Sequence, residues 1–180
     1  MVYPIVKYGQ RVLEMPAEPI TEFDTPELHK LIDDMFESMY AAKGVGLAAT
    51  QIGLGKRIAV IDTSNGEDHS AKLVLINPEI LQKEGAQTGE EGCLSIPGFR
   101  EQVTRSNKVT VKAQDAMGEW FEKTGEGLLA RAFQHETDHL NGTLYITHIS
   151  PLKRDLIRRK IRKMQKLGEW GVRVREREPS

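Results

Sequence analysis

Residues 134 to 142 carry the pattern best suited to chemistry, an H-E-x-x-H run formed by His135, Glu136 and His139. On a helix, residues four apart lie on one face, so the two imidazoles can reach a single metal ion. Glu136 would sit beside that ion, where a carboxylate can take a proton from water and pass it to a leaving group. The alternative is a helix that carries two surface histidines by chance. The motif alone suggests metal-assisted hydrolysis.

Cys93 is the only cysteine and lies in the segment EEGCLSIPG, whose glycines and proline exclude a regular helix. A lone cysteine is more often inert than catalytic. The H-E-x-x-H run, however, supplies two nitrogen ligands, and no third histidine follows at the short spacing found in one branch of the metalloproteases. A thiolate from Cys93 would complete a three-ligand site with an open position, as catalytic metals use.

The segment GVGLAATQIG, residues 44 to 53, contains glycines and alanines that allow close approach of the backbone. It lacks the pattern of a phosphate-binding loop. A plain connection between a helix and a strand is the simpler interpretation. Gln51 supports a second one, because its neutral amide can donate a hydrogen bond to an oxyanion.

The elements that position these residues begin with an N-terminal arm and a helix. The length of 180 residues, with 39% hydrophobic and 28% charged residues, fits one ordinary domain. Three prolines in residues 1 to 24 predict an extended arm. Thr25 and Pro26 predict the N-cap and first residue of an amphipathic helix that ends near Lys43 and Gly44.

From Arg57 the pattern changes to that of strands. Short β-rich runs follow, namely RIAVIDT, KLVLINP, EILQKEG, NKVTVKAQD and EWFEKTGEG. Residues 64 to 66 predict a turn, and residues 117 and 118 predict a hairpin. The order of helix, strands and helices predicts an α+β fold, with antiparallel β-sheets packed around a central metal-binding helix and with an N-terminal and a C-terminal helix.

The C-terminal segment differs from the rest in charge. Residues 151 to 180 hold eleven Lys and Arg against four Asp and Glu, whereas the first 150 residues hold 14 against 22. Ser150 and Pro151 predict a helix start. A solvated outer face is the common explanation of such charge, but a basic face on an acidic body favours a polyanionic partner. The helix should dock through an apolar stripe of Leu152, Leu156, Ile157, Ile161, Met164 and Leu167.

Residues 1–150 therefore form the predicted catalytic part, and residues 151–180 form a basic C-terminal helix and tail of the same single domain. No apolar stretch is long enough to cross a bilayer, and the N-terminus has neither a signal-peptide core nor a transit pattern. One cysteine allows no intrachain disulfide. We expect a cytoplasmic protein without a membrane partner.

Three segments in order, GVGLAATQIG, EEGCLSIPG and QHETDHLNG, resemble the three signature motifs of the bacterial-type peptide deformylases, and the similarity runs from the N-terminal arm through the final helix. The resemblance implies a metal-dependent hydrolase that removes the formyl group from the formyl-methionine of nascent polypeptides and releases formate. It implies Cys93, His135 and His139 as ligands of one divalent metal ion, Fe²⁺ in preference to Zn²⁺, Ni²⁺ or Co²⁺.

The resemblance also implies roles for residues around the metal. Glu136 would be the general base and acid, and Gln51 with the backbone N–H of Leu94 would hold the oxyanion. The backbone at Val45 and Gly46 would pair with the substrate as an added strand. An apolar pocket for the methionine side chain would be formed by Val45, Leu128 and Ala132, although ordinary core explains the last two equally well. Arg100 would reach a substrate carbonyl or remain a surface charge.

The sequence departs from the family pattern at two positions. Thr147 stands where an acidic residue is common, and Gly89 stands near a position that carries a bulkier apolar residue in some members, which predicts a more open pocket rim. Glu91 and Arg105 are expected to form an ion pair that braces the Cys93 loop, with the small contribution typical of exposed pairs.

Two other classes of function remain open. A zinc-dependent endopeptidase shares H-E-x-x-H but needs a third ligand downstream. A ribosome-binding or RNA-binding module explains the basic tail but not the combination of Cys93 with H-E-x-x-H, and RNP-type aromatic motifs are absent from the sequence. Because a deformylase substrate emerges from the ribosome, we expect the C-terminal helix to bind ribosomal RNA near the exit tunnel.

Overall fold

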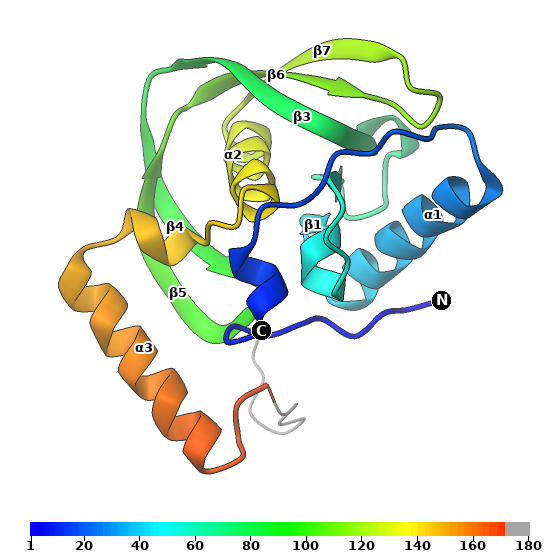
Figure 1. The fold of residues 1–180 in the computed structure, drawn as a ribbon. Coiled ribbons are helices and arrows are strands. Elements are labelled where there is room, and N and C mark those ends of the chain that lie inside the picture. Colours follow the sequence, from blue (N-terminus) through cyan, green and yellow to red (C-terminus); the bar gives the residue numbers. More distant parts are fainter. Residues whose placement is uncertain (172–180) are drawn as a thin grey trace.

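Figure 1 shows the computed structural model, which describes residues 1–171. The helices are α1 (Pro26–Ala41), α2 (Leu128–Leu140) and α3 (Pro151–Lys166). The strands are β1 (Gly46–Ala48), β2 (Ile58–Ile61), β3 (Leu73–Glu84), β4 (Gln87–Cys93), β5 (Ile96–Arg105), β6 (Lys108–Gln114) and β7 (Trp120–Glu126). One helix comes first, the strands follow, and two helices come last, which confirms the predicted α+β class.

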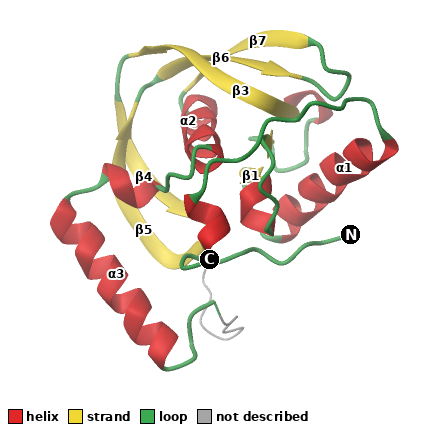
Figure 2. Cartoon of the chain, viewed as in Figure 1, coloured by secondary structure: helices red, strands yellow, loops and turns green. Residues whose placement is uncertain are grey.

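The strands form two antiparallel sheets. The larger has the order β1-β2-β3-β6-β7, and the smaller is the β4-β5 hairpin. Helix α2 lies between the sheets, as Figure 2 shows, with α1 and α3 on the outside. Buried residues of α2, among them Ala130 and Phe133, pack against Val109, Val111 and Ala113 of β6. The predicted arrangement of antiparallel sheets around a central helix is confirmed.

Helix α1 begins at the predicted residue and ends at Ala41, slightly before the predicted end, and the N-terminal arm contains a short 3-10 turn at Arg11–Glu14. The Thr25 side chain accepts a hydrogen bond from the backbone N–H of Leu28 at 3.1 Å, and Pro26 occupies the first turn. The arm is hydrogen-bonded to the segments that contain Gln51 and Cys93. The Val6 N–H donates to the Gln51 carbonyl at 2.7 Å, and the Tyr8 N–H donates to the Ser95 carbonyl at 2.8 Å. The arm thus holds two motif segments together.

Asp62 organises the predicted turn after β2. Its side chain is fully buried and accepts hydrogen bonds from the backbone N–H groups of Ser64 at 2.8 Å and Gly66 at 3.1 Å, and from the Tyr40 hydroxyl. Its own N–H donates to the Val45 carbonyl at 2.8 Å. Burial and the hydrogen bond from the Tyr40 hydroxyl to the Asp62 carboxylate raise the pKa of Tyr40 to about 12. The turn therefore ties α1 to the residue that precedes β1.

Helix α3 begins at the predicted cap, where the Ser150 side chain accepts from the Lys153 N–H at 3.2 Å. The predicted docking stripe is wrong in part. Ile157 and Ile161 are buried in the cluster that contains Tyr145. Arg154, Arg158 and Met164 are partly buried, and the other side chains of the helix are exposed. Exposed fractions are 70% at Leu152, 44% at Leu156 and 61% at Leu167.

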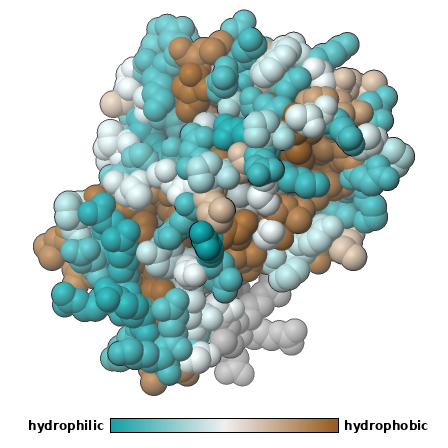
Figure 3. All heavy atoms as spheres, in the orientation of Figure 1, coloured by the Kyte–Doolittle hydropathy of each residue, from teal (hydrophilic) through white to brown (hydrophobic). Residues whose placement is uncertain are grey.

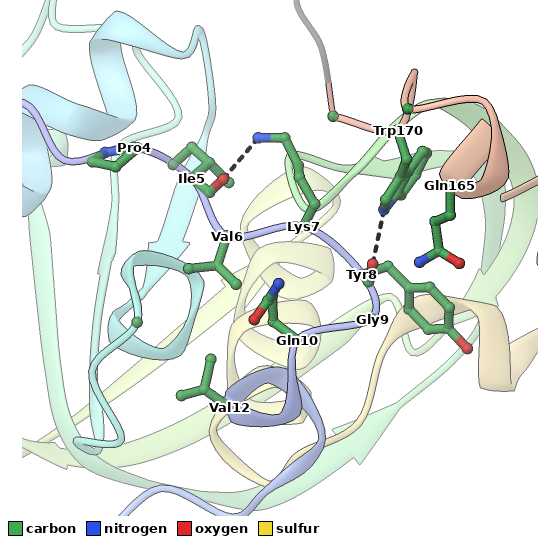
Figure 4. A pocket seen from close by; sticks show the side chains of 13 residues that line it. Pro4, Ile5, Val6, Lys7, Tyr8, Gly9, Gln10, Val12, Gln165 and Trp170 are labelled. Carbon is green, nitrogen blue, oxygen red and sulfur yellow. Dashed lines mark hydrogen bonds between the residues drawn. The ribbon is translucent and has the colours of Figure 1, made fainter. Parts of the chain in front are cut away.

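Polar contacts supply the remaining attachment of α3. The Arg158 Nε donates to the Tyr8 hydroxyl at 3.2 Å, and the indole N–H of Trp170 donates to the Tyr8 carbonyl at 2.8 Å (Figure 4). Hydrophilic side chains cover most of the α3 region on the face drawn in Figure 3. Residues 172–180 of the predicted tail lie outside the described residues. Among the described helices, none has the length and apolar character to cross a membrane.

Candidate active site

Three metal-ligating side chains from two elements converge beside α2. His135 and His139 lie one turn apart on α2, and Cys93 ends β4. The Cys93 sulfur lies 3.3 Å from His139 Nε2, which lies 3.1 Å from His135 Nε2, and the three ligand atoms all fall within 4.8 Å of one another. A thiolate and two imidazoles gathered at one point fit a divalent cation with an open coordination position. These residues form a Cys-His-His metal-binding triad.

Glu91 orients one of the ligands. Its Oε2 lies 2.7 Å from His135 Nδ1, and Arg105 donates to both carboxylate oxygens, at 3.1 and 2.7 Å. The expected Glu91–Arg105 ion pair is therefore present, but it is buried, with side-chain exposures of 5% and 4%. Burial opposes ionisation, yet the hydrogen bonds from His135 and Arg105 hold the pKa of Glu91 well below its usual range. An ionised Glu91 keeps the proton on His135 Nδ1 and leaves Nε2 for a cation.

Glu136 is a buried carboxyl without a hydrogen-bond partner at Oε1 among the described residues. Burial raises the pKa of Glu136 to about 7. A carboxyl with such a pKa gains and loses a proton near neutral pH, as a proton carrier must. Gly46 at the start of β1 packs directly against this side chain.

Gln51 has a fixed orientation in the short 3-10 turn after β1. Its Oε1 accepts from the Ala48 N–H at 3.0 Å, which directs the amide nitrogen toward Cys93 Sγ at 3.5 Å and Ser95 Oγ at 3.3 Å. The donor end of the amide therefore faces the triad. Leu94 follows Cys93, and its side chain lies against Gly44, where a Cβ would stand 2.8 Å from Leu94 Cδ1.

A cavity of about 220 Å³ opens beside Glu136. Leu128 is half exposed at the cavity, whereas Ala132 is buried and belongs both to the cavity wall and to the hydrophobic core between α2 and β6. Arg100 stands at the exposed rim, where its Nε donates to Glu90 at 3.0 Å. The cavity brings together the five predicted substrate-binding residues, Val45, Gly46, Arg100, Leu128 and Ala132, with Leu94, His135 and Glu136. A larger hollow of about 740 Å³ lies away from the triad, between the N-terminal arm and the end of α3 (Figure 4).

The two departures from the family pattern lie outside the triad. Gly89 faces Arg131, whose Nη2 would be 3.3 Å from an added Cβ, and Arg131 is the residue of the two that lines the cavity. The more open rim stays a prediction. Thr147 donates to the Leu144 carbonyl at 2.9 Å within a short 3-10 turn. The Thr147 hydroxyl therefore makes a local hydrogen bond at the position where an acidic residue is common in the family pattern.

Sequence reasoning missed two contributors to the site. Tyr145 stacks on the His135 ring with centroids 6.4 Å apart, and Arg131 lines the cavity and donates to Glu91 at 2.7 Å. Arg131 lies one turn before His135, so helical spacing was the signal that could have revealed it. Tyr145 had no such signal, because only the chain path after α2 returns it to the site.

Comparison with known proteins agrees with this geometry. A model of the polypeptide deformylase family matches residues 2–155. The chain is 64% identical over 170 residues to a peptide deformylase of Acidobacterium capsulatum, covering 94% of this chain and 99% of that protein. A crystal structure of a peptide deformylase from Legionella pneumophila superposes with a TM-score of 0.85 and 45% identity, covering 99% and 100% of the two chains.

A second solved structure, the peptide deformylase from Thermus thermophilus, superposes with a TM-score of 0.83 at 40% identity and covers 93% of this chain and 98% of its own. The family match spans all three motifs and the triad. This chain belongs to the polypeptide deformylase family.

Proposed function

We propose that this deformylase works through Glu136 as its proton carrier, beside a cation held by Cys93, His135 and His139. The activity is the removal of the N-formyl group from nascent peptides, and the family assignment selects it over an endopeptidase or an RNA-binding module. The observation that carries the assignment of Glu136 is a buried carboxyl whose Oε1 has no hydrogen-bond partner among the described residues, in the cavity that His135 also lines.

The reaction is a hydrolysis of the formyl C–N bond. A divalent cation held by Cys93, His135 and His139 would supply Lewis acidity, which would favour a nucleophilic water near neutral pH and polarise the formyl carbonyl. Glu136 accepts the proton of the attacking water and returns it to the amine nitrogen as the C–N bond breaks, so formate and a free N-terminus leave. Gln51 Nε2 and the backbone N–H of Leu94 donate to the oxygen that becomes negative.

Substrate recognition follows from the position of β1. It is the terminal strand of the larger sheet and pairs only with β2 in the described sheet order. An extended peptide can therefore add to its open side through backbone hydrogen bonds at Val45 and Gly46. The methionine side chain enters the cavity beside Val45, Leu128 and Ala132, and Arg100 at the rim donates to a substrate carbonyl.

The cation that we assign to the triad in the cell is Fe²⁺. Cysteine and imidazole ligands also suit Zn²⁺, Ni²⁺ and Co²⁺, so ligand type alone does not select the metal. Metal analysis of protein purified without oxygen, assayed in parallel for formate release, tests the assignment. Zinc as the dominant metal in the most active preparation would contradict it.

The basic face of α3 is the second part of the proposal. Its exposed cations, which include Arg159, Lys160 and Lys163, lie on a chain whose first 150 residues are acidic. We assign this face to ribosomal RNA near the exit tunnel, where the substrate emerges. The division into a catalytic part, residues 1–150, and a basic part, residues 151–180, follows from the same asymmetry. A cytoplasmic location is also part of the proposal and rests on the lack of a signal-peptide or transit pattern in the sequence.

A matched pair of peptides tests the reaction. One carries an N-formylated methionine and the other the same sequence with a free amine. We expect formate from the first and no cleavage of internal bonds in either. Internal cleavage of the unblocked peptide would restore the endopeptidase alternative.

A further inference from the structure

We propose that Arg131 is a positioning residue for the metal ligand His135, that it acts through Glu91, and that Gly89 makes room for its guanidinium. The inference rests on His135 being a metal ligand. It adds to the deformylase site a buried residue that neither contacts the cation nor transfers a proton.

Arg131 and His135 hold the two oxygens of one carboxylate. Arg131 Nη1 donates to Glu91 Oε1 at 2.7 Å, and His135 Nδ1 lies 2.7 Å from Glu91 Oε2. The two residues are four apart on α2, so their side chains leave the same face of the helix one turn apart. Glu91 therefore spans one turn of α2 and cannot rotate away from His135 without breaking its bond to Arg131.

Arg105 does not replace this contact. It binds both oxygens of Glu91, but it comes from β5, and its Nη1 also donates to Asp138 at 2.7 Å. Two carboxylates thus share the charge of Arg105. Arg131 supplies the second guanidinium of this buried group and the contact to Glu91 that comes from the same helix as the metal ligand.

The guanidinium of Arg131 is anchored on its far side as well. Its Nη2 donates to the Val103 carbonyl at 3.1 Å, and the residue is only 8% exposed. Arginine suits the position because its planar fork makes two bonds at once in fixed directions, which lysine cannot do. The side chain therefore links β5 to Glu91 on β4 and sets where the carboxylate stands.

Gly89 on β4 provides the space. A Cβ there would lie 3.3 Å from Arg131 Nη2, closer than an ordinary contact, so the guanidinium would have to shift by a few tenths of an ångström. Any larger side chain at this position would occupy the volume that the guanidinium fills. In the sequence, this arrangement appears as a Gly-x-Glu-x-Cys segment that begins at Gly89 and an Arg-x-x-x-His-Glu segment that begins at Arg131.

The test uses the cobalt-loaded protein in competition with a chelator of known affinity. The thiolate-to-cobalt absorption reports both the Kd for Co²⁺ and the geometry of the site. Removal of a residue that supports a metal ligand typically weakens metal binding by about 10- to 100-fold. We expect Arg131→Met to raise the Kd within that range and to shift the absorption, and Arg131→Lys to recover part of the loss.

Two further variants make the test specific. Gly89→Ala changes no charge and should raise the Kd for Co²⁺ by a smaller factor than Arg131→Met does. Arg11→Met removes an exposed arginine in the first 3-10 turn and should leave the Kd and the absorption unchanged.

Three outcomes would overturn all or part of the proposal. A wild-type Kd and absorption in Arg131→Met would overturn it as a whole. Should that variant fail to fold, wild-type values in both Arg131→Lys and Gly89→Ala would do the same. A wild-type Kd in Gly89→Ala alone would remove the role of Gly89. Failure of the ligand assignment is separate, because the wild-type protein would then lack the thiolate-to-cobalt absorption.

Discussion

Gly46 and Glu136 are in contact with no space for a side chain between them: a Cβ on residue 46 would stand 2.5 Å from Glu136 Oε2 and 2.9 Å from its Cδ. The strand that we assign to substrate pairing therefore also confines the proton carrier. A change in one must alter the other, because Glu136 is buried.

Gly46→Ala should displace the Glu136 carboxyl and lower kcat for deformylation. Misplacement of a catalytic group by about 1 Å can cost on the order of 10²-fold in rate. The bound metal should stay at the wild-type level, because the triad is untouched. Gly55→Ala is the matched control, since an added Cβ there meets no atom of the described residues 1–171 within 4 Å. Wild-type formate release by Gly46→Ala would show that Glu136 relaxes freely.

Glu136→Gln should retain the metal and lose most of its turnover. The substitution keeps the size of the side chain and removes the proton transfer, which contributes typically 10²- to 10⁴-fold in such reactions. Formate release and metal content are measured on the same sample. Turnover close to that of the unmodified protein would exclude Glu136 as the general base, whereas loss of metal would mean that the site itself was disturbed.

Cys93 should resist alkylation while a metal is bound and react once the metal is removed. A metal-bound thiolate is not free to attack an alkylating reagent. Labelling is followed by mass of the intact protein, before and after chelation; the protein has one cysteine, so the added mass is assigned without ambiguity. Equal labelling in the two states would argue against ligation.

Asp62 should stabilise the fold at neutral pH and lose this effect in acid. Burial alone would raise its pKa, but hydrogen bonds from Ser64 and Tyr40 lower it below the ordinary value of 3.8. A carboxyl whose pKa is lower in the folded state contributes its full stability above the unfolded pKa, and that stability is lost as the pH falls through the folded pKa.

Asp62→Asn should therefore lower the free energy of unfolding at pH 7 by about 2 kcal/mol, the scale of hydrogen bonds to a charged group. The difference from wild type should shrink once the pH falls below 3.8. Chemical denaturation of both proteins at neutral and acidic pH measures it. A difference that stays constant across this window would assign the effect to packing.

The basic face of α3 should govern ribosome binding. Arg158 is a poor choice for reversal, because its Nε bonds to the Tyr8 hydroxyl. Reversal of Arg159, Arg162 and Lys163 to Glu should reduce co-sedimentation with ribosomes in a salt-dependent manner, with normal deformylation of a free peptide. The same number of reversals at Lys83, Lys108 and Lys123 serves as control. Unchanged co-sedimentation at low salt would return α3 to a purely structural role.

Local signals predicted where α1 and α3 begin. Thr25 and Ser150 are caps because a side-chain oxygen satisfies a free N–H of the first turn, and that chemistry is visible in three or four consecutive residues. The same holds for the i, i+4 pair of His135 and His139. Such features depend only on spacing along the chain.

Features that depend on which surfaces meet were not predictable in this way. The periodicity of α3 showed an apolar stripe but not that Leu152, Leu156 and Leu167 face solvent, because the extent of the body beneath the helix is a tertiary property. The burial of the Glu91–Arg105 pair has the same origin. Its environment comes from α2, an element that follows both residues in the sequence and is separated from them by two further strands.

Strand β1 has a further consequence for the behaviour of the protein in solution. An open strand edge accepts any extended chain, including another copy of the same protein, and is a common start of aggregation. β1 is only three residues long and passes directly into a 3-10 turn at Ala49. So short an edge offers few backbone groups for pairing. A peptide that binds there must gain additional affinity from the neighbouring cavity. The shortness of β1 therefore limits how strongly this exposed edge can pair with another copy of the protein.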